Sequence, residues 1–184
     1  MSLTQIRISG SGGQGLLLSA AILAQTLTNE GKAVARSQSY EPTSRGGLSR
    51  SDLVIGEAGD GFPLATELDY LVILDQCAAH ASDHLIKPGA TVLIDPKKVT
   101  TPPTGDFTAL ELPALDIALA LGNRRAANVV ALGALVGLSG LCDFADLEVS
   151  VRARTPASAL DVNMEALAKG RQWAEQASAE MEVA

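Results

Sequence analysis

Residues 4–29 read TQIRISGSGGQGLLLSAAILAQTLTN, with the glycine-rich segment Gly10–Gly15 (GSGGQG) at their centre. Apolar and polar residues alternate from 5 to 9, which predicts a strand. From 16 to 29 apolar residues recur at helical spacing, which predicts a helix. A glycine-rich turn between strand and helix directs several backbone N–H groups at one point, where the helix N-terminus adds partial positive charge. The stretch therefore predicts an α/β fold with an anion site at this turn.

The glycine segment also satisfies the dinucleotide fingerprint G-x-G-x-x-G through Gly10, Gly12 and Gly15. A nicotinamide-binding domain should carry an acidic residue at the end of its second strand, about 20 residues further on. Glu41 is the only candidate, and Pro42 with a turn follows it directly. The second crossover helix of a standard dinucleotide domain is missing there. Two readings remain open, a tight turn without a ligand and a turn that contacts an anion or cofactor.

The rest of the chain predicts further strands and helices around this unit. The segment between the second and third strands is too short for a helical crossover, so we expect these two strands to be antiparallel. The predicted fold is a Rossmann-like, three-layer α/β/α domain with a mostly parallel, mixed sheet, spanning residues 1–184. Strands are expected at 33–39, 51–56, 70–75, 91–95 and 108–112, a turn at 87–89, and helices at 78–84, 115–121, 124–141 and within 157–179.

Length, charge and cysteine content limit the function classes. A chain of 184 residues fits one domain with a proper core, and 47% of its residues are hydrophobic. The net charge of −7 argues against nucleic acid as a partner, because phosphate binding requires a basic face. Two cysteines are too few for an iron–sulfur cluster or a four-thiolate zinc site. With no visible signal peptide and no apolar stretch of spanning length, we expect a cytoplasmic protein without a membrane segment.

A second candidate site lies in the polar loop after the second strand, which contains Tyr40 and the triplet Arg45-Gly46-Gly47. A guanidinium beside two glycines can hold a phosphate or carboxylate through paired hydrogen bonds while the backbone approaches closely. The alternative is a surface turn with a solvated charge. If the first two strands are parallel, this loop leaves the same sheet edge as the glycine segment, which favours a shared site.

Other titratable residues give weaker signals. Cys77, His80 and His84 have the types and spacing of metal ligands, but nothing nearby completes a closed site, so we interpret them as ordinary helix residues and expect no metal. Asp75 and Asp95 each end a buried strand, where a carboxylate either faces a ligand crevice or caps the next turn.

Asn128 lies in an otherwise apolar helix and needs a hydrogen-bond partner if it is buried. Arg124 and Arg125 precede it, as an exposed helix start or a subunit contact. No nucleophile–base pair and no pair of carboxylates forms a complete catalytic set. The sequence therefore predicts that the chain is not an enzyme on its own.

Several motifs in the same order resemble the gamma subunit, or gamma domain, of the 2-oxoacid:ferredoxin oxidoreductases. The resemblance covers nearly the full chain. One departure is that the family usually has Tyr-Gly-Pro-Glu where this chain has Tyr40-Glu41-Pro42-Thr43. The motifs are GSGGQG at 10–15, SYEPTSRGG at 39–47, SRSDL at 49–53, KPGAT at 87–91, NRRAAN at 123–128 and LGA at 132–134.

The resemblance implies an accessory subunit, inactive alone, of a complex that decarboxylates a 2-oxoacid on thiamine diphosphate. Electrons pass through iron–sulfur clusters to ferredoxin, and an acyl-CoA often forms. Thiamine diphosphate, Mg and the clusters then belong to alpha, beta and, in some complexes, delta subunits, while coenzyme A is a co-substrate. The substrate type, whether pyruvate, 2-oxoglutarate, ketoisovalerate or indolepyruvate, stays open. The alternative is a stand-alone Rossmann-type nucleotide-binding protein.

Both the residues and the resemblance lead to one expected contact surface for an anion, coenzyme A or a partner subunit. Its members are Gly10, Gly12, Gly13, Gln14, Gly15, Tyr40, Arg45, Gly46, Gly47 and Asn128.

Overall fold

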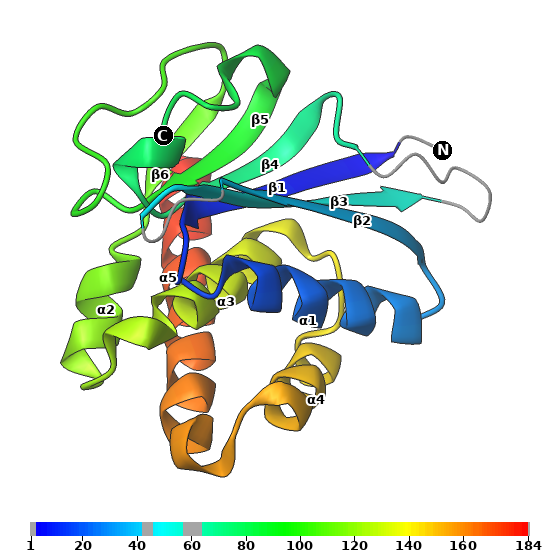
Figure 1. Ribbon diagram of the computed structural model, residues 1–184, viewed down its shortest axis with the longest axis vertical. Helices are drawn as coiled ribbons and strands as arrows, with labels where there is room; N and C mark the ends of the chain where they lie inside the picture. The colour runs from blue at the N-terminus through cyan, green and yellow to red at the C-terminus, as the bar shows by residue number, and fades with distance from the viewer. Residues whose placement is uncertain (1–2, 42–45, 57–63, 184) are drawn as a thin grey trace.

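A computed structural model describes residues 3–41, 46–56 and 64–183. Its strands form one six-stranded sheet with the order β2-β3-β1-β4-β5-β6 (Figure 1). The strands are β1 Thr4–Ser11, β2 Ala33–Tyr40, β3 Leu48–Gly56, β4 Leu68–Ile73, β5 Ile86–Ile94 and β6 Thr108–Glu111.

The sheet is mixed, as the short connection between the second and third strands predicts. β3 lies between β1 and β2 and is antiparallel to both, whereas β1, β4, β5 and β6 pair in parallel. Two successive antiparallel pairings make β1 and β2 run in the same direction. The loops that follow these two strands therefore leave the sheet at the same edge, which confirms the condition for a shared site.

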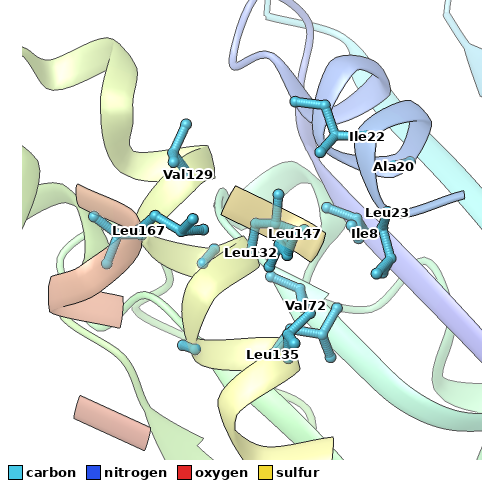
Figure 2. Packing of buried hydrophobic residues seen from close by; sticks show 14 of the residues in the cluster. Ile8, Ala20, Ile22, Leu23, Val72, Val129, Leu132, Leu135, Leu147 and Leu167 are labelled. Atoms are coloured by element: carbon cyan, nitrogen blue, oxygen red, sulfur yellow. The ribbon is translucent and has the colours of Figure 1, made fainter. Parts of the chain in front are cut away.

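The five α-helices of the described residues cover one face of this sheet (Figure 1). Their apolar side chains meet inward-facing strand residues such as Ile8 and Val72 in the main core, where Leu23, Leu132 and Leu147 lie together (Figure 2). These residues are almost fully buried, and apolar burial of this kind is the main stabilising term of a fold. The helices are α1 Leu16–Asn29, α2 Ala114–Ala120, α3 Ala127–Ser139, α4 Phe144–Arg154 and α5 Leu160–Val183.

The opposite face of β4 and β5 carries a second apolar cluster. Leu71, Ile73 and Val92 pack there against Ala78 and Val99. Short 3-10 turns, η1 Gln76–Ala78 and η2 Asp83–Leu85, contribute to this side together with the segment that follows β5. The α/β class and the mixed sheet are confirmed, and the layer on this face consists of turns instead of α-helices. The prediction of a helix over 78–84 is wrong, because the two 3-10 turns occupy this connection.

Two sequence-based assignments need correction, and one helix was not predicted. The predicted turn at 87–89 lies inside β5, where the pairing with β4 jumps from Leu68/Ile86 to Tyr70/Thr91 and the intervening residues bulge out of the ladder. The long helix predicted from 124 begins as a 3-10 turn, η3 Arg124–Ala126, and continues as α3. The helix α4 was not anticipated by the apolar spacing, since its exposed residues include Val149 and it buries few side chains.

Helices α3 and α5 cross with their backbones in unusually close contact. A Cβ atom on Gly133 of α3 would overlap the Leu167 carbonyl oxygen, and one on Gly170 of α5 would overlap the Val130 carbonyl oxygen. Only hydrogen at these two positions permits the approach. The crossing fixes α3 beneath the sheet, and the N-terminal end of α3 reaches the edge where the glycine segment lies.

Candidate functional site

The glycine segment connects the carboxyl end of β1 to the first turn of α1. Gly13 and Gly15 adopt positive φ angles of 92° and 77°, which side-chain-bearing residues rarely adopt. Gly15 forms the N-cap of α1, and its carbonyl accepts the N–H groups of Leu18 and Ser19. The N–H groups of Gly13 and Gly15 have no acceptor among the described residues. The segment thus has the form of an anion-binding turn at a helix N-terminus.

The second predicted loop contacts the first one directly. The Gly12 N–H donates to the Gly47 carbonyl oxygen at 2.9 Å. Gly46 has a φ of 78°, and Tyr40, the last residue of β2, has 65% of its side-chain surface exposed. The two loops therefore meet at Gly12 and Gly47, while Arg45 lies outside the described residues.

Gln14 holds the glycine segment against the neighbouring strands. Its Oε1 atom accepts the Ser11 N–H at 2.8 Å, and its Nε2 atom donates to the Leu74 carbonyl at 2.9 Å. A Cβ on Gly10 would overlap Oε1 of Gln14, so a larger residue there would displace the Gln14 side chain. One side-chain amide thus ties the turn to the ends of both β1 and β4.

Asn128 holds the other end of the segment from α3. Its Nδ2 atom donates to the Gly15 carbonyl at 3.1 Å and to Oγ of Ser19 at 3.0 Å, and that hydroxyl donates to the Asn128 carbonyl at 3.3 Å. Asn128 is 6% exposed, so the partner expected for a buried amide is present. A Cβ on Gly15 would lie 2.6 Å from Nδ2, which makes glycine necessary at this contact.

These elements surround a pocket of about 350 Å³ at the carboxyl ends of β1, β4 and β5. The chain leaves β1 toward β2 on one side of the sheet and leaves β4 toward β5 on the other, and α/β folds commonly bind ligands at such a switch point. Three cationic side chains line it, Lys98 after β5 and Arg124 and Arg125 before α3. Both arginines are exposed. The remaining lining residues are Ser11, Gly12, Gly13, Gln14, Leu74, Asp75, Asp95, Leu115, Ala127 and Asn128.

Two carboxylates of the pocket also shape its walls. Asp75 caps η1 by accepting the Cys77 N–H, accepts the Ser11 hydroxyl at 3.3 Å, and lies 3.8 Å from Nζ of Lys98. Asp95 is 1% exposed and accepts the N–H groups of Lys97 and Leu115. Burial raises the pKa of Asp95, while these N–H groups lower it. Both alternatives raised by the sequence thus hold for these residues, since each caps a turn and each lines the crevice.

The pocket includes cations that sequence reasoning did not place in it. Lys98 carried no motif signal, and Arg124 and Arg125 were interpreted only as a helix start or subunit contact. Their one available signal was position, because each follows a predicted strand end or begins a predicted helix.

The described parts of the chain contain no group of three His, Cys, Asp or Glu residues suited to a metal ion. His80 instead contacts Asp83, with 3.0 Å between Nδ1 and Oδ2. Within residues 3–41, 46–56 and 64–183, no helix is long and apolar enough to span a membrane.

Comparison with known proteins agrees with this architecture. The family model described as pyruvate ferredoxin/flavodoxin oxidoreductase matches residues 5–173. A 2-oxoglutarate synthase subunit, KorC, of Methanocaldococcus jannaschii is 34% identical over 176 residues, covering 94% of each chain. The gamma subunit of a keto/oxoacid ferredoxin oxidoreductase from Geobacter sulfurreducens has a TM-score of 0.82 at 32% identity, covering 94% of this chain and 99% of that one.

A further solved structure shows the same fold within a longer chain. It is a 2-oxoglutarate:ferredoxin oxidoreductase from Magnetococcus marinus with 2-oxoglutarate, coenzyme A and succinyl-CoA bound. The TM-score is 0.85 at 22% identity, covering 96% of this chain and 32% of that one. Together the matches define a class, the 2-oxoacid oxidoreductases. The chain belongs to the gamma-subunit family of the 2-oxoacid:ferredoxin oxidoreductases, and is a subunit of such a complex.

Proposed function

We propose that this gamma subunit packs on thiamine-diphosphate-dependent catalytic subunits and that its pocket holds the phosphates of coenzyme A. In this proposal the complex oxidatively decarboxylates a 2-oxoacid, and the gamma chain carries no catalytic residue of its own. Thiamine diphosphate, Mg and the iron–sulfur clusters lie in alpha, beta or delta subunits, and electrons leave through ferredoxin. The two cysteines of the chain, Cys77 and Cys142, agree with this division, because a cluster requires more thiolates.

The observation that carries the proposal is the position of the three cations opposite the glycine segment. Lys98, Arg124 and Arg125 line one pocket with Gly12 and Gly13. Guanidinium groups and backbone N–H groups are the donors that bind phosphate oxygens best, and coenzyme A presents several phosphates. The three cations outnumber the two carboxylates of the pocket, Asp75 and Asp95, in a chain whose net charge is −7.

Exposed apolar side chains offer contacts for a partner subunit. Leu18 in the first turn of α1, Leu119 in α2 and Tyr40 at the end of β2 are 45%, 47% and 65% exposed. Exposed apolar residues indicate contact with another chain where they form a contiguous patch. This also supports a second candidate function, a purely structural subunit in which both loops contact only partner chains.

Calorimetric titration of coenzyme A into the assembled complex separates the candidates. If the cations bind phosphate, the double variant Arg124→Ala/Arg125→Ala weakens binding about tenfold or more, since each lost charged hydrogen bond costs about 1.5–3 kcal/mol. The matched control is Arg152→Ala/Arg154→Ala in the last turn of α4, where both arginines are exposed and outside the pocket. Arg45→Ala tests the loop residue that lies outside the described residues.

Two outcomes contradict the proposal. An unchanged affinity for coenzyme A in an intact complex carrying Arg124→Ala/Arg125→Ala would favour the structural subunit. Tight binding of a nicotinamide or flavin nucleotide by the isolated chain would instead favour a stand-alone nucleotide-binding protein.

A further inference from the structure

Two neutral amides hold the glycine segment from opposite sides. Gln14 bridges the Ser11 N–H and the Leu74 carbonyl at the sheet, and Asn128 of α3 bridges the Gly15 carbonyl and the hydroxyl of Ser19 in α1. We infer that Gln14 and Asn128 are positioning residues, and that they set the geometry of the anion pocket instead of binding the ligand through their own amide groups. The inference rests on the proposed function of that pocket.

The hydrogen bonds of the two side chains support this role. The Gln14 amide connects Ser11 of the glycine segment to Leu74 after β4. The Asn128 amide of α3 binds Gly15 of the segment and Ser19 of α1. Both Gln14 donor and acceptor atoms are already engaged, as is the Nδ2 atom of Asn128. An amide satisfies these groups without adding a charge, so the cationic character of the pocket is left to the lysine and the arginines.

Asn128 connects the two parts of the pocket that the sequence places far apart. Arg124 and Arg125 lie in η3, which leads directly into α3, and Asn128 lies in the first turn of that helix. Its bonds to Gly15 and Ser19 lock the N-terminal end of α3 to the N-terminal end of α1. Two helix N-termini therefore converge on one pocket with a fixed separation, and a ligand phosphate meets donors that are already in place.

The groups that bind the two amides make the pocket sensitive to the replacement of either amide by a carboxylate. In Asn128→Asp, a carboxylate oxygen would replace Nδ2 and face the Gly15 carbonyl, so a donor–acceptor contact becomes a repulsion between two acceptors. In Gln14→Glu the same happens at the Leu74 carbonyl. Each near-isosteric change removes the bond that the amide donates, to the Gly15 or the Leu74 carbonyl, while keeping the volume of the side chain.

The test measures amide hydrogen exchange of the gamma chain in the assembled complex without ligand, and then anion affinity. Asn128→Asp, Asn128→Ala and Gln14→Ala should accelerate exchange at residues 12–19. They should also weaken the binding of coenzyme A and of inorganic pyrophosphate by the same factor, about five- to tenfold, because both ligands use the same displaced donors. Asn163→Ala and Gln25→Ala, which remove amides outside the pocket, should change neither quantity.

The possible outcomes distinguish this inference from the proposed function. Unchanged exchange in ligand-free Asn128→Ala and Gln14→Ala overturns the positioning role, whatever the affinity. Faster exchange with unchanged affinity, while Arg124→Ala/Arg125→Ala still weakens binding, also overturns it and leaves only a structural role. The proposed function is rejected if the wild-type complex binds neither probe, or if Arg124→Ala/Arg125→Ala leaves the binding of both probes unchanged. The positioning role for anion binding is then rejected as well, even if the variants exchange faster.

Discussion

At the residue scale, Cys77 lies beside the pocket and its thiol should be unreactive at neutral pH. Partial burial, followed by the charge and hydrogen bond of the neighbouring Asp75 carboxylate, raises its pKa to about 11. At pH 8 only about one thiol in a thousand is then the nucleophilic thiolate, against about a quarter for a thiol of ordinary pKa. Alkylation by iodoacetamide should therefore be about two hundredfold slower than that of a free thiol, and should accelerate about tenfold per pH unit up to pH 10.

A stopped time course read by mass spectrometry measures this rate at each pH. Cys142 is 8% exposed with a pKa raised by burial to about 12, so Cys77→Ser should leave almost no labelling below pH 9. Asp75→Asn should increase the rate at Cys77, because the change removes a charge that stabilises the protonated thiol. A rate at Cys77 that already levels off near pH 8 would contradict the prediction.

Individual residues also show why part of the site could be read from the sequence and part could not. The glycines of the turn were predictable, since a missing side chain at fixed spacing between a strand and a helix reports a backbone requirement. Asp75 and Asp95 were located as strand-ending carboxylates, with their role undecided. Lys98 was missed because a lone lysine after a strand carries no pattern. Only the parallel arrangement of β1, β4 and β5 brings it opposite the glycine segment.

At the element scale, the crossing of α3 and α5 depends on the absence of a side chain at Gly170. Replacing glycine by alanine inside a helix normally stabilises it by about 1 kcal/mol. Here the added Cβ would overlap the Val130 carbonyl and lie 2.8 Å from the Ala134 nitrogen, so the two helices must separate. We expect Gly170→Ala to lower the free energy of unfolding by about 1–3 kcal/mol, the usual cost of overpacking.

Urea unfolding followed by circular dichroism gives this difference. Ala168→Gly, at an exposed position of the same helix, is the control that measures helix propensity without the crossing. A Gly170→Ala variant as stable as the unaltered chain would mean that the crossing tolerates a wider spacing.

The elements themselves were predictable to different degrees, for physical reasons. The first strand and helix and the antiparallel second pair follow from periodicity and from the short connection between β2 and β3. The helix α4 lacked a signal, because only Leu147, Ser150 and Val151 of its residues are buried. The turn-like sequence Lys87-Pro88-Gly89 was interpreted as a chain reversal, whereas a bulge in the β4–β5 ladder accommodates it inside a strand.

At the scale of the whole molecule, the two sides of the sheet have different tasks. Helices on one face form the main core, which fixes the N-terminal ends of α1 and α3. On the other face, Gln76 in η1 accepts the N–H groups of Thr100 and Thr101, and so holds the segment after β5 that carries Lys98. The pocket at the carboxyl edge is therefore assembled from both layers. A gamma subunit built this way can supply fixed donors to a ligand whose reactive end lies in another subunit.

This division of labour predicts which kinetic constant a change in the pocket will affect. Lys98→Ala removes one cation and leaves Asp75 without the partner 3.8 Å away, so the pocket becomes more negative toward a phosphate. If the pocket holds only the phosphates of coenzyme A, the KM for coenzyme A should rise about five- to tenfold in the assembled complex. The KM for the 2-oxoacid, and kcat at saturating coenzyme A, should not change, because the reacting atoms lie elsewhere. Steady-state reduction of ferredoxin measures all three constants, with Lys169→Ala, at an exposed position of α5, as the matched control. A rise in the KM for the 2-oxoacid as well would contradict a pocket that holds only coenzyme A, since the loss of binding to one substrate should leave the KM for the other unchanged.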